Sequence, residues 1–329
     1  MNPRVSTVDS NTYGINFEMR LPTNWNGRFL HQGNGGIDGA VVTATGATGG
    51  GPLTHALHQG FAVLSSDAGH PRSLGPNFGV DPQARLDYGY QAVGSLTPMA
   101  KKVITFAYSK GPDRSYFAGC SNGGRHAMVA ATRYAADYDG ILAGAPGYNV
   151  PKAALANIAG AQLYASVAAS SDISTGFTAA ERRMVGNAVL TGCDALDGVT
   201  DHMAQDVTAC QAAFSLERVV LTCAGARDGT CLTTAQKSAI GKIFSGPTTA
   251  SGARIYSSFP YDPGIGQPGN ASWEFTVPLA LDSGAVGIIF RHPAGEPERL
   301  RRPASRSAPT STRSWRASTP PAASTPHRA

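Results

Sequence analysis

The alternation of apolar and polar residues predicts that the chain begins with strands and then alternates strands with helices. Residues 15–21 alternate apolar and polar side chains, as a half-buried strand does. A turn containing Pro22 and Gly27 separates this segment from the next strand. Farther along the chain, short apolar runs predict strands, and apolar residues at helical spacing predict helices. Further strands are expected at 28–31, 61–65, 115–118 and 138–146, the end of a helix at 55–60, and helices at 96–108 and 125–134.

The pattern changes at about residue 148. Alanine-rich helical segments, cysteines and loops fill the stretch from 148 to 266. We interpret residues 148–290 as a mostly helical lid that follows the first part of an α/β core at 1–147. Lids of this kind commonly carry the substrate pocket. A chain of 329 residues has room for one large α/β domain with such an insertion.

The last stretch, residues 291–329, differs in composition from everything before it. It contains seven prolines and eight arginines, and Leu300 and Trp315 are its only large apolar residues. Such a segment cannot form a core strand or an amphipathic helix, so we expect it to be a disordered basic tail.

Charge separates this tail from the rest of the chain. The formal net charge is +5, but the tail alone, with eight Arg and two Glu, contributes +6. The remaining 290 residues carry 19 basic and 20 acidic side chains and are nearly neutral. This balance argues against a nucleic-acid-binding face on the folded part.

Neither a membrane span nor an export signal is visible. No run of about 18 apolar residues occurs in the sequence, so no transmembrane helix is expected. Residues 1–12 are polar and lack the basic and then apolar profile of a signal peptide. The residues alone therefore leave two alternatives, a cytosolic protein or a sequence that lacks the start of a longer precursor.

The segment from Tyr116 to Arg125, YFAGCSNGGR, carries the main chemical motif. An apolar strand leads into Gly-Cys-Ser-Asn-Gly, and a helix follows. A serine with glycines two residues before and two after it, between a strand and a helix, is typical of a nucleophile elbow. The glycines are needed because the serine adopts a strained backbone and the strand and helix pack closely. Ser121 is therefore the candidate nucleophile.

A glycine cluster, Gln32–Gly36, follows the predicted strand at 28–31. It can be a plain flexible turn, or a loop whose Gly35 or Gly36 N–H joins the Asn122 N–H in an oxyanion hole. With Ser121 downstream, we favour the second interpretation.

Asp67 and His70 lie close enough in sequence to suggest two members of a catalytic triad. Hydrolases that carry a nucleophile elbow place the acid and the base after the nucleophile in chain order. We therefore expect both residues to fix a loop.

An acidic loop lies in the predicted lid, between Cys193 and Met203. Asp194, Asp197 and Asp201 offer carboxylates around a glycine, and the carbonyl groups of Val199 and Met203 could complete an oxygen shell for a hard cation. The spacing is not that of an EF-hand. A solvated acidic loop is an equally good interpretation of the residues alone.

The five cysteines exclude the common metal-binding arrangements. No Cys-x-x-Cys pair occurs, and no Cys/His spacing matches a structural zinc site. An odd count leaves one thiol without a partner. The local pairs Cys193/Cys210 and Cys223/Cys231 would leave Cys120, beside the candidate nucleophile.

A general base for Ser121 is the missing part of the motif. A serine nucleophile needs a base within hydrogen-bond reach and an acid that orients the base. Four histidines follow Ser121 in the chain. His126 is on the elbow helix, His202 is in the acidic loop, and His292 and His327 belong to the tail. None is placed as a base would be.

These motifs together resemble the tannase and feruloyl esterase family. Five segments carry the resemblance, which runs from about residue 15 to 290: 21–36 (LPTNWNGRFLHQGNGG), 60–70 (GFAVLSSDAGH), 116–125, 138–146 (YDGILAGAP) and 193–201. The resemblance implies an exported, secreted or periplasmic protein with an α/β-hydrolase core and a lid that holds calcium. It also implies hydrolysis of esters of aromatic acids such as gallate and ferulate.

The resemblance also implies roles for individual residues. Ser121 corresponds to the nucleophile, and the N–H groups of Asn122 and of Gly35 or Gly36 correspond to the oxyanion hole. The implied calcium ligands are Asp194, Asp197, Val199, Asp201 and Met203, and the implied disulfides are Cys193–Cys210 and Cys223–Cys231. In the family, the cysteine before the serine bonds to a cysteine directly after the catalytic histidine. Neither that His-Cys pair nor the catalytic Asp has a counterpart here, which leaves Cys120 unpaired.

Our hypothesis is that the sequence is truncated or frameshifted near residue 290, leaving the core incomplete at its C-terminal end. The Arg/Pro/Ala/Ser bias beyond this point is that expected of GC-rich DNA read out of frame. An open sheet edge and weak or absent turnover are then expected.

Three functions follow from the sequence, in order of preference. The first is an impaired serine esterase acting on a small aromatic ester. The second is a non-catalytic, calcium-stabilised remnant or binding protein, and the third is polyanion binding by the tail. The sequence leaves the acyl group, the alcohol and the oligomeric state open.

Overall fold

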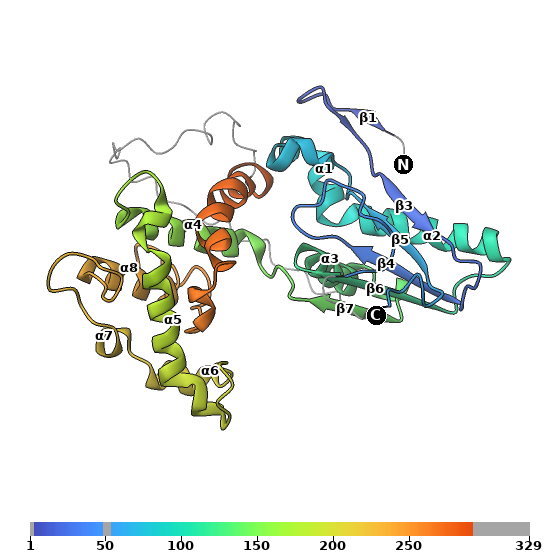
Figure 1. Ribbon diagram of the computed structural model, residues 1–329. Helices are drawn as coiled ribbons and strands as arrows, with labels where there is room; N and C mark the ends of the chain where they lie inside the picture. Colours follow the sequence, from blue (N-terminus) through green and yellow to red (C-terminus); the bar gives the residue numbers. More distant parts are fainter. Residues whose placement is uncertain (1–2, 49–53, 292–329) are drawn as a thin grey trace, which may run out of the picture.

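The computed structural model describes residues 3–48 and 54–291, which form an α/β core and a helical lid (Figure 1). The predicted tail at 291–329 lies outside these residues except for its first position. A five-stranded sheet forms the centre of the core, in the order β3-β5-β4-β6-β7, with β3 antiparallel to β5 and the other pairs parallel. Its strands are β3 (Phe17–Arg20), β4 (Arg28–Gly33), β5 (Ala62–Ser66), β6 (Arg114–Cys120) and β7 (Gly140–Gly144), and a separate hairpin is formed by β1 (Arg4–Val5) and β2 (Thr12–Tyr13).

Helices pack on the sheet because each has an apolar face. The helix α2 (Ala92–Tyr108) buries Leu96, Ala100 and Ile104 against Phe29 and Leu64 of the strands. The helix α3 (Asn122–Arg133) packs on the same sheet beside Phe117. Shorter helices of the core are η1 (Arg72–Val80), α1 (Pro82–Leu86), η2 (Asp87–Gln91) and η3 (Ala135–Asp137).

The lid has its own apolar core, which lies among helices that follow β7. Tyr164, Phe177, Val189 and Ile240 are buried at its centre. The helical segments begin with α4 after β7, and the division into a core at 1–147 and a lid at 148–290 stays a prediction. Its elements are α4 (Val150–Ser166), η4 (Ile173–Gly176), α5 (Ala179–Cys193), η5 (Asp194–Asp197), α6 (Val207–Ala213), α7 (Leu216–Val219), α8 (Thr234–Ser245), η6 (Pro263–Gly266), η7 (Ser272–Thr276), η8 (Pro278–Asp282) and η9 (Ala285–Ile289).

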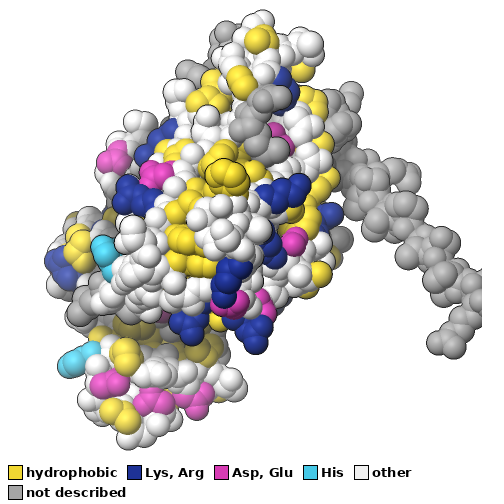
Figure 2. All heavy atoms as spheres, turned by 90° about the vertical axis from the view of Figure 1, so that its right-hand side faces the viewer, with side chains coloured by type: hydrophobic (Ala, Val, Ile, Leu, Met, Phe, Trp, Pro, Cys, Tyr) yellow, Lys and Arg dark blue, Asp and Glu magenta, His cyan; other side chains and the backbone are white. Residues whose placement is uncertain are grey.

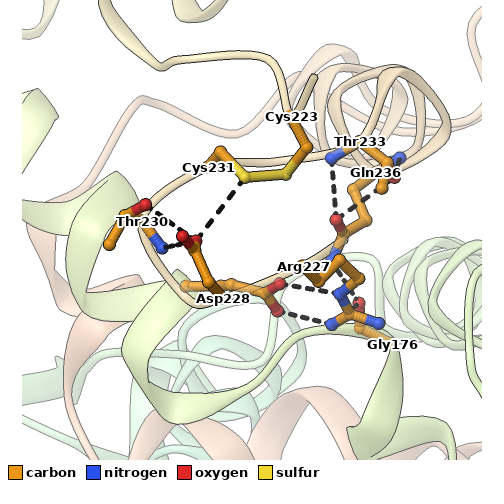
Figure 3. The surroundings of a disulfide bond; sticks show 9 residues. Gly176, Cys223, Arg227, Asp228, Thr230, Cys231, Thr233 and Gln236 are labelled. Atoms are coloured by element: carbon orange, nitrogen blue, oxygen red, sulfur yellow. Dashed lines mark hydrogen bonds and ion pairs between the residues drawn. A yellow bond between two sulfur atoms is a disulfide. The ribbon is translucent and has the colours of Figure 1, made fainter. Parts of the chain in front are cut away.

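Buried polar contacts and a disulfide hold one end of the lid together (Figure 3). Arg227 forms an ion pair at 2.6 Å with Glu181, whose side chain is 1% exposed. Glu181 also accepts from the Thr178 N–H in a capping box that starts α5. The Cys223–Cys231 disulfide closes the adjacent loop. A paired buried charge of this kind is stable only while both partners remain.

The last described helical segment links the lid to the core. Ala285 and Ile289 on η9 are buried in a cluster with Tyr13, Phe78 and Tyr88 of the core. In Figure 1 this segment, drawn in orange, runs up to the start of α1. The lid is therefore joined to the core at two places, through the chain after β7 and through η9.

The strand β7 is the last strand of the sheet that the described residues form. It pairs with β6 on one side, and residues 3–48 and 54–291 place no strand on its other side. Leu142 in its middle is 62% exposed. On α2 the side chain of Phe106 is 92% exposed, and Figure 2 shows hydrophobic side chains gathered on the end of the core that lies away from the lid. Within the described residues β7 is therefore an edge strand, as β3 is at the other side of the sheet, and the hypothesis of missing core strands stays a prediction.

Two local predictions need correction or addition. Residues 55–60, predicted as the end of a helix, form turns in which the Gln59 N–H donates to His55 and Ala56 carbonyl groups. The β1–β2 hairpin was not predicted, because two-residue strands carry no periodicity. The described residues contain no helix that is both long and apolar enough to cross a membrane.

Burial of His31 on β4 gives a prediction for stability against pH. His31 is 2% exposed, with its Nδ1 at 3.0 Å from Thr97 Oγ1. Burial, with a smaller effect of the neighbouring His126, lowers the pKa of His31 to about 3. Between pH 6.5 and 3 the unfolded chain therefore binds a proton that the folded chain does not, and stability falls as the pH falls. The expected loss from this residue at pH 5 is about 2 kcal/mol.

Urea unfolding at pH 5, 6 and 7 tests this expectation. The His31→Asn variant, which keeps a polar group near Thr97, should show a smaller slope of unfolding free energy against pH than the parent chain. His58 is exposed, and its replacement by asparagine should leave the slope unchanged. Equal slopes for the parent and His31→Asn would contradict the prediction.

Candidate active site

Ser121 lies in a sharp turn between β6 and α3. Its φ is 59° and its ψ is −120°, a conformation that costs a non-glycine residue about 1–3 kcal/mol. Hydrogen bonds hold it: the Ser121 N–H donates to Gly144 O at 3.0 Å, and the Ser121 carbonyl accepts from the N–H groups of Arg125 at 3.0 Å and Gly147 at 3.1 Å. Ser121 itself is exposed. The geometry is that of the nucleophile elbow predicted from the motif.

Two glycines let α3 approach the sheet. A Cβ atom on Gly119 would lie 2.5 Å from the backbone of Gly123, and one on Gly123 would lie 2.3 Å from the carbonyl oxygen of Gly33. Atoms cannot approach so closely without a shift of the backbone. The N-terminus of α3 is therefore held directly against the ends of β4 and β6.

The glycine loop after β4 is anchored at its base and open at its tip. Asn34 Nδ2 donates to Ser65 Oγ at 3.0 Å and to Ser66 O at 2.8 Å, at the end of β5. No heavy atom lies within 4 Å of an added Cβ on Gly35 or Gly36. Both glycines are exposed, so the tip of the loop is open to solvent while its base is fixed.

The loop and the elbow, 88 residues apart, are in contact. Asn122 Nδ2 donates to Asn34 O at 3.3 Å, and Gly33 packs on Gly123. The structure thus places Asn122, the residue after Ser121, in contact with the base of the loop that carries Gly35 and Gly36. The assignment of the oxyanion hole to the N–H groups of Asn122 and of Gly35 or Gly36 stays a prediction.

A buried network beneath the elbow was missed by sequence reasoning. Asp38 Oδ2 accepts from Asn122 Nδ2 at 2.7 Å and lies 2.8 Å from His126 Nε2. Arg125 Nε donates to Asn122 Oδ1 at 2.7 Å, and Tyr88 OH donates to the same oxygen at 3.2 Å. The spacing of Asn122 and His126, four residues apart on one helix face, was the only signal in the sequence.

The charges in this network are balanced. Burial alone would raise the pKa of Asp38, but His126, Arg125 and Asn122 hold the pKa of this carboxyl below its usual range. Burial and the charge of Arg125 lower the pKa of His126 despite the attraction of Asp38. The network therefore contains an ionised carboxylate, and His126 Nε2 lies between two charged groups, 2.8 Å from Asp38 Oδ2 and 3.0 Å from Arg125 Nη2.

The histidines of the described chain do not supply a base to Ser121. His126 is 3% exposed and faces Asp38. His70 Nε2 donates to Ile37 O at 2.8 Å, and His202 lies in the acidic loop of the lid, where its main-chain N–H donates to Asp194. Within residues 3–48 and 54–291, Ser121 Oγ has no hydrogen-bond partner. His292 and His327 lie outside the described residues.

The role of Asp67 and His70 is the loop-fixing one that we expected. Asp67 Oδ1 accepts from the N–H groups of Asn16 at 3.0 Å and Gly69 at 2.9 Å. His70 stacks on Phe78 with ring centroids 3.6 Å apart. Both side chains hold segments around the sheet end, away from any contact with Ser121.

The acidic loop after α5 uses its carboxylates locally. Asp194 Oδ1 accepts from the Asp201 and His202 N–H groups, and Asp197 accepts from the Val199 N–H at 3.0 Å. Asp201 Oδ1 accepts from the Met203 N–H at 3.1 Å. In the described chain no three Asp, Glu, His or Cys side chains gather as a metal-binding set.

The cysteines pair as the family resemblance implied. The structure forms the Cys193–Cys210 and Cys223–Cys231 disulfides, both in the lid. Cys120 is free and partly exposed next to Ser121. The first disulfide fixes the start of the acidic loop to α6.

The lid contains a pocket of about 450 Å³ between α4, α8 and the segment that follows α8. Tyr164, Phe244, Ile265 and Trp273 give it apolar walls, and Glu274 contributes a carboxyl group. Burial raises the pKa of Glu274. This pocket is lined by lid residues alone, so the predicted role of the lid in substrate binding stays a prediction.

The sequence of the chain is similar to known proteins over most of its length. The family described as tannase and feruloyl esterase matches residues 3–276. The chain is 37% identical over 279 residues to a mono(2-hydroxyethyl) terephthalate hydrolase of Piscinibacter sakaiensis, covering 78% of this chain and 46% of that protein. It is 30% identical over 279 residues to a probable feruloyl esterase B-1 of Neosartorya fischeri, covering 82% and 50%.

A solved feruloyl esterase structure also resembles this chain. Feruloyl esterase B from Aspergillus oryzae matches with a TM-score of 0.70 and 28% identity, covering 86% of this chain and 53% of that one. This likeness confirms the α/β-hydrolase fold predicted from the sequence. The chain spans about half the length of the curated relatives it matches.

Proposed function

The chain belongs to the tannase and feruloyl esterase family, and on this premise we propose that it is a carboxylic ester hydrolase with Ser121 as its nucleophile. The observation that carries the proposal is the strained and exposed Ser121 beside the open Gly35–Gly36 tip. Strain at an exposed serine persists only when the surrounding structure holds it, and it is concentrated at functional sites.

The reaction follows from the positions of these groups. Ser121 Oγ attacks the ester carbonyl carbon, and the N–H groups of Asn122 and of Gly35 or Gly36 stabilise the oxyanion. The proton of Ser121 Oγ passes to solvent, the C–O bond to the alcohol breaks, and the leaving alkoxide takes up a proton from solvent. Water hydrolyses the acyl-serine and releases the acid.

The proposed substrates are esters of hydroxyaromatic acids, such as galloyl or feruloyl esters. Support comes from the names of the relatives, which are feruloyl esterases and a terephthalate hydrolase. Release of acid from methyl ferulate, methyl gallate and methyl hexanoate tests this class. Faster hydrolysis of the hexanoate than of both aromatic esters would contradict it.

The rate of this chain is proposed to be low, because no imidazole of the described residues reaches Ser121 Oγ. Removal of triad members costs several powers of ten in rate. The same observation favours an alternative, a calcium-stabilised protein that binds without turnover. Calcium-dependent melting without any burst of product would support the alternative.

The compartment is proposed to be extracellular or periplasmic. Two disulfides in one small lid are typical of proteins that fold under oxidising conditions. Reducing agent should therefore lower the melting temperature of the protein.

Calcium binding to the acidic loop is the remaining part of the proposal. Asp194, Asp197 and Asp201, with the carbonyl groups of Val199 and Met203, are oxygen donors of the kind that Ca²⁺ prefers. The disulfide at Cys193 fixes the start of the loop. Calcium at about 100 times its dissociation constant should stabilise the fold by about 2.7 kcal/mol.

Thermal melting with Ca²⁺, Mg²⁺ or EDTA checks this expectation. Asp197→Asn should remove most of the stabilisation by calcium. Asp228 offers a matched control, because it also accepts a backbone N–H two residues ahead, from Thr230 at 2.9 Å. Asp228→Asn should keep the calcium response, and an unchanged response in Asp197→Asn would contradict the proposed site.

A further inference from the structure

Several hydrogen bonds hold the loop that carries Gly35 and Gly36. Asn34 binds the end of β5, Ile37 O accepts from His70, and the Gly39 N–H donates to Asp67 O at 3.1 Å. The side chain of Asp38 is, among the described residues, the only side chain of this loop bonded to α3. Three anchors therefore fix the loop to β5 and to the segment after it. Two contacts fix it to the elbow helix, one through the Asp38 carboxylate and one through Asn34 O, which accepts from Asn122 Nδ2 at 3.3 Å.

Asn122 receives this connection. Its Nδ2 donates to Asp38 Oδ2 and to Asn34 O, and its Oδ1 accepts from Arg125 and Tyr88. All hydrogen-bonding positions of the amide are thus occupied. Asn122 is also the residue whose main-chain N–H follows the nucleophile, so the contact joins the two halves of the predicted oxyanion hole.

We propose that Asp38 is a positioning residue that sets the separation between the Asn122 N–H and the Gly35–Gly36 N–H groups. The proposal rests on the proposed function for its catalytic meaning, and on the buried contacts for its geometry. Asp38 has a φ of 60°, and its N–H donates to Gly35 O at 3.2 Å. The glycine tip and the residue that carries the carboxylate therefore belong to one hydrogen-bonded turn.

The surroundings of Asp38 favour positioning over an electrostatic role. Its side chain is 2% exposed, and Arg125 Nη2 lies 4.0 Å from its Oδ2. Arg125 is itself fixed by hydrogen bonds to the Tyr88 and Gly89 carbonyl groups and lies over the Tyr88 ring. A bare negative charge near the site would oppose an oxyanion, and Arg125 offsets that charge.

An arylboronic acid provides a test that needs no general base. Ser121 Oγ adds to boron, its proton goes to solvent, and the tetrahedral boronate, which carries its formal negative charge on boron, places a B–OH oxygen where the oxyanion would lie. With 4-hydroxyphenylboronic acid as the probe, Asp38→Asn should weaken binding at least tenfold, since loss of one oxyanion donor costs about 10²–10³ in rate. Loss of a negative charge without loss of position would instead strengthen binding.

Matched variants separate positioning from a general loss of stability. Asp81 is also a buried carboxylate, paired with Arg4 and capping α1 through the Ala84 N–H at 2.7 Å. Asp81→Asn should leave boronate affinity within twofold of the parent. His126→Gln, which keeps a donor towards Asp38, should retain more affinity than His126→Leu.

Hydrogen exchange gives a readout that does not depend on activity. Asp38→Asn should speed amide exchange in residues 33–38 and 121–125, and Asp81→Asn should not. Parent-like exchange or boronate affinity in folded Asp38→Asn overturns the inference. If the parent chain binds no boronate at Ser121, the proposed function fails, and the exchange data alone then decide whether Asp38 positions the loop.

Discussion

Replacing Ser121 by alanine is expected to abolish covalent labelling of the protein by an activated aromatic ester. The expectation follows from the turn between β6 and α3, where the hydroxyl is exposed on a strained backbone. Incubation with p-nitrophenyl ferulate should add one feruloyl group to the parent chain. Intact-mass spectrometry would detect it, and peptide mapping should place it on Ser121. The alanine variant should show no adduct at the same time points.

A second serine of the chain provides the control for this experiment. Ser109, at the end of α2, is exposed and has a φ of 57°, so it shares the exposure and the positive φ of Ser121. It lacks the glycine loop and the helix N-terminus. Ser109→Ala should therefore leave labelling unchanged. An equal amount of adduct in Ser121→Ala would remove Ser121 from the proposed mechanism.

Gly123→Ala is expected to cause the largest loss of stability among the single substitutions considered. The added Cβ would lie 2.3 Å from Gly33 O and 2.6 Å from Gly33 C. Both are backbone atoms, so no side chain can turn away, and either α3 or the end of β4 must move. We expect a loss of about 3 kcal/mol, measured as a shift of the urea unfolding midpoint.

Gly241 in α8 is the matched control for this substitution. It is also a glycine within a helix, but an added Cβ has no heavy atom within 4 Å. Alanine there should stabilise the protein by up to about 1 kcal/mol, because it is the better helix former. If Gly123→Ala were as stable as Gly241→Ala, the close approach of α3 to β4 would not exist in solution.

The sequence was most informative where structure is local. The strand before Ser121, the helix after it and the glycines around it are all readable within ten residues, and the structure places them as expected. The two lid disulfides span 17 and 8 residues, and their pairing was also expected. The prediction of a helix end at 55–60 was wrong. Residues that form successive turns can resemble the last turn of a helix in sequence, so the two were not distinguished.

Contacts between distant residues could not be predicted. Asp38 and His126 are 88 residues apart, and neither has a periodicity that marks it as a partner of the other. The same limit applies to η9, whose Ile289 packs with Phe78 of the core. Both functions of the glycines were predicted, since Gly119 and Gly123 permit the close approach of α3 as well as the turn at Ser121.

The position of β6 in the sheet has a consequence for the medium in which Ser121 would react. Only β7 separates β6 from the sheet edge in the described chain, and Leu142 on β7 is largely exposed. Hydrogen bonds to an oxyanion are strong where the local dielectric constant is low. In the described chain, protein therefore encloses the turn less on the side of β7. The proposed N–H donors would stabilise an oxyanion less strongly here than at a serine that protein encloses on both sides.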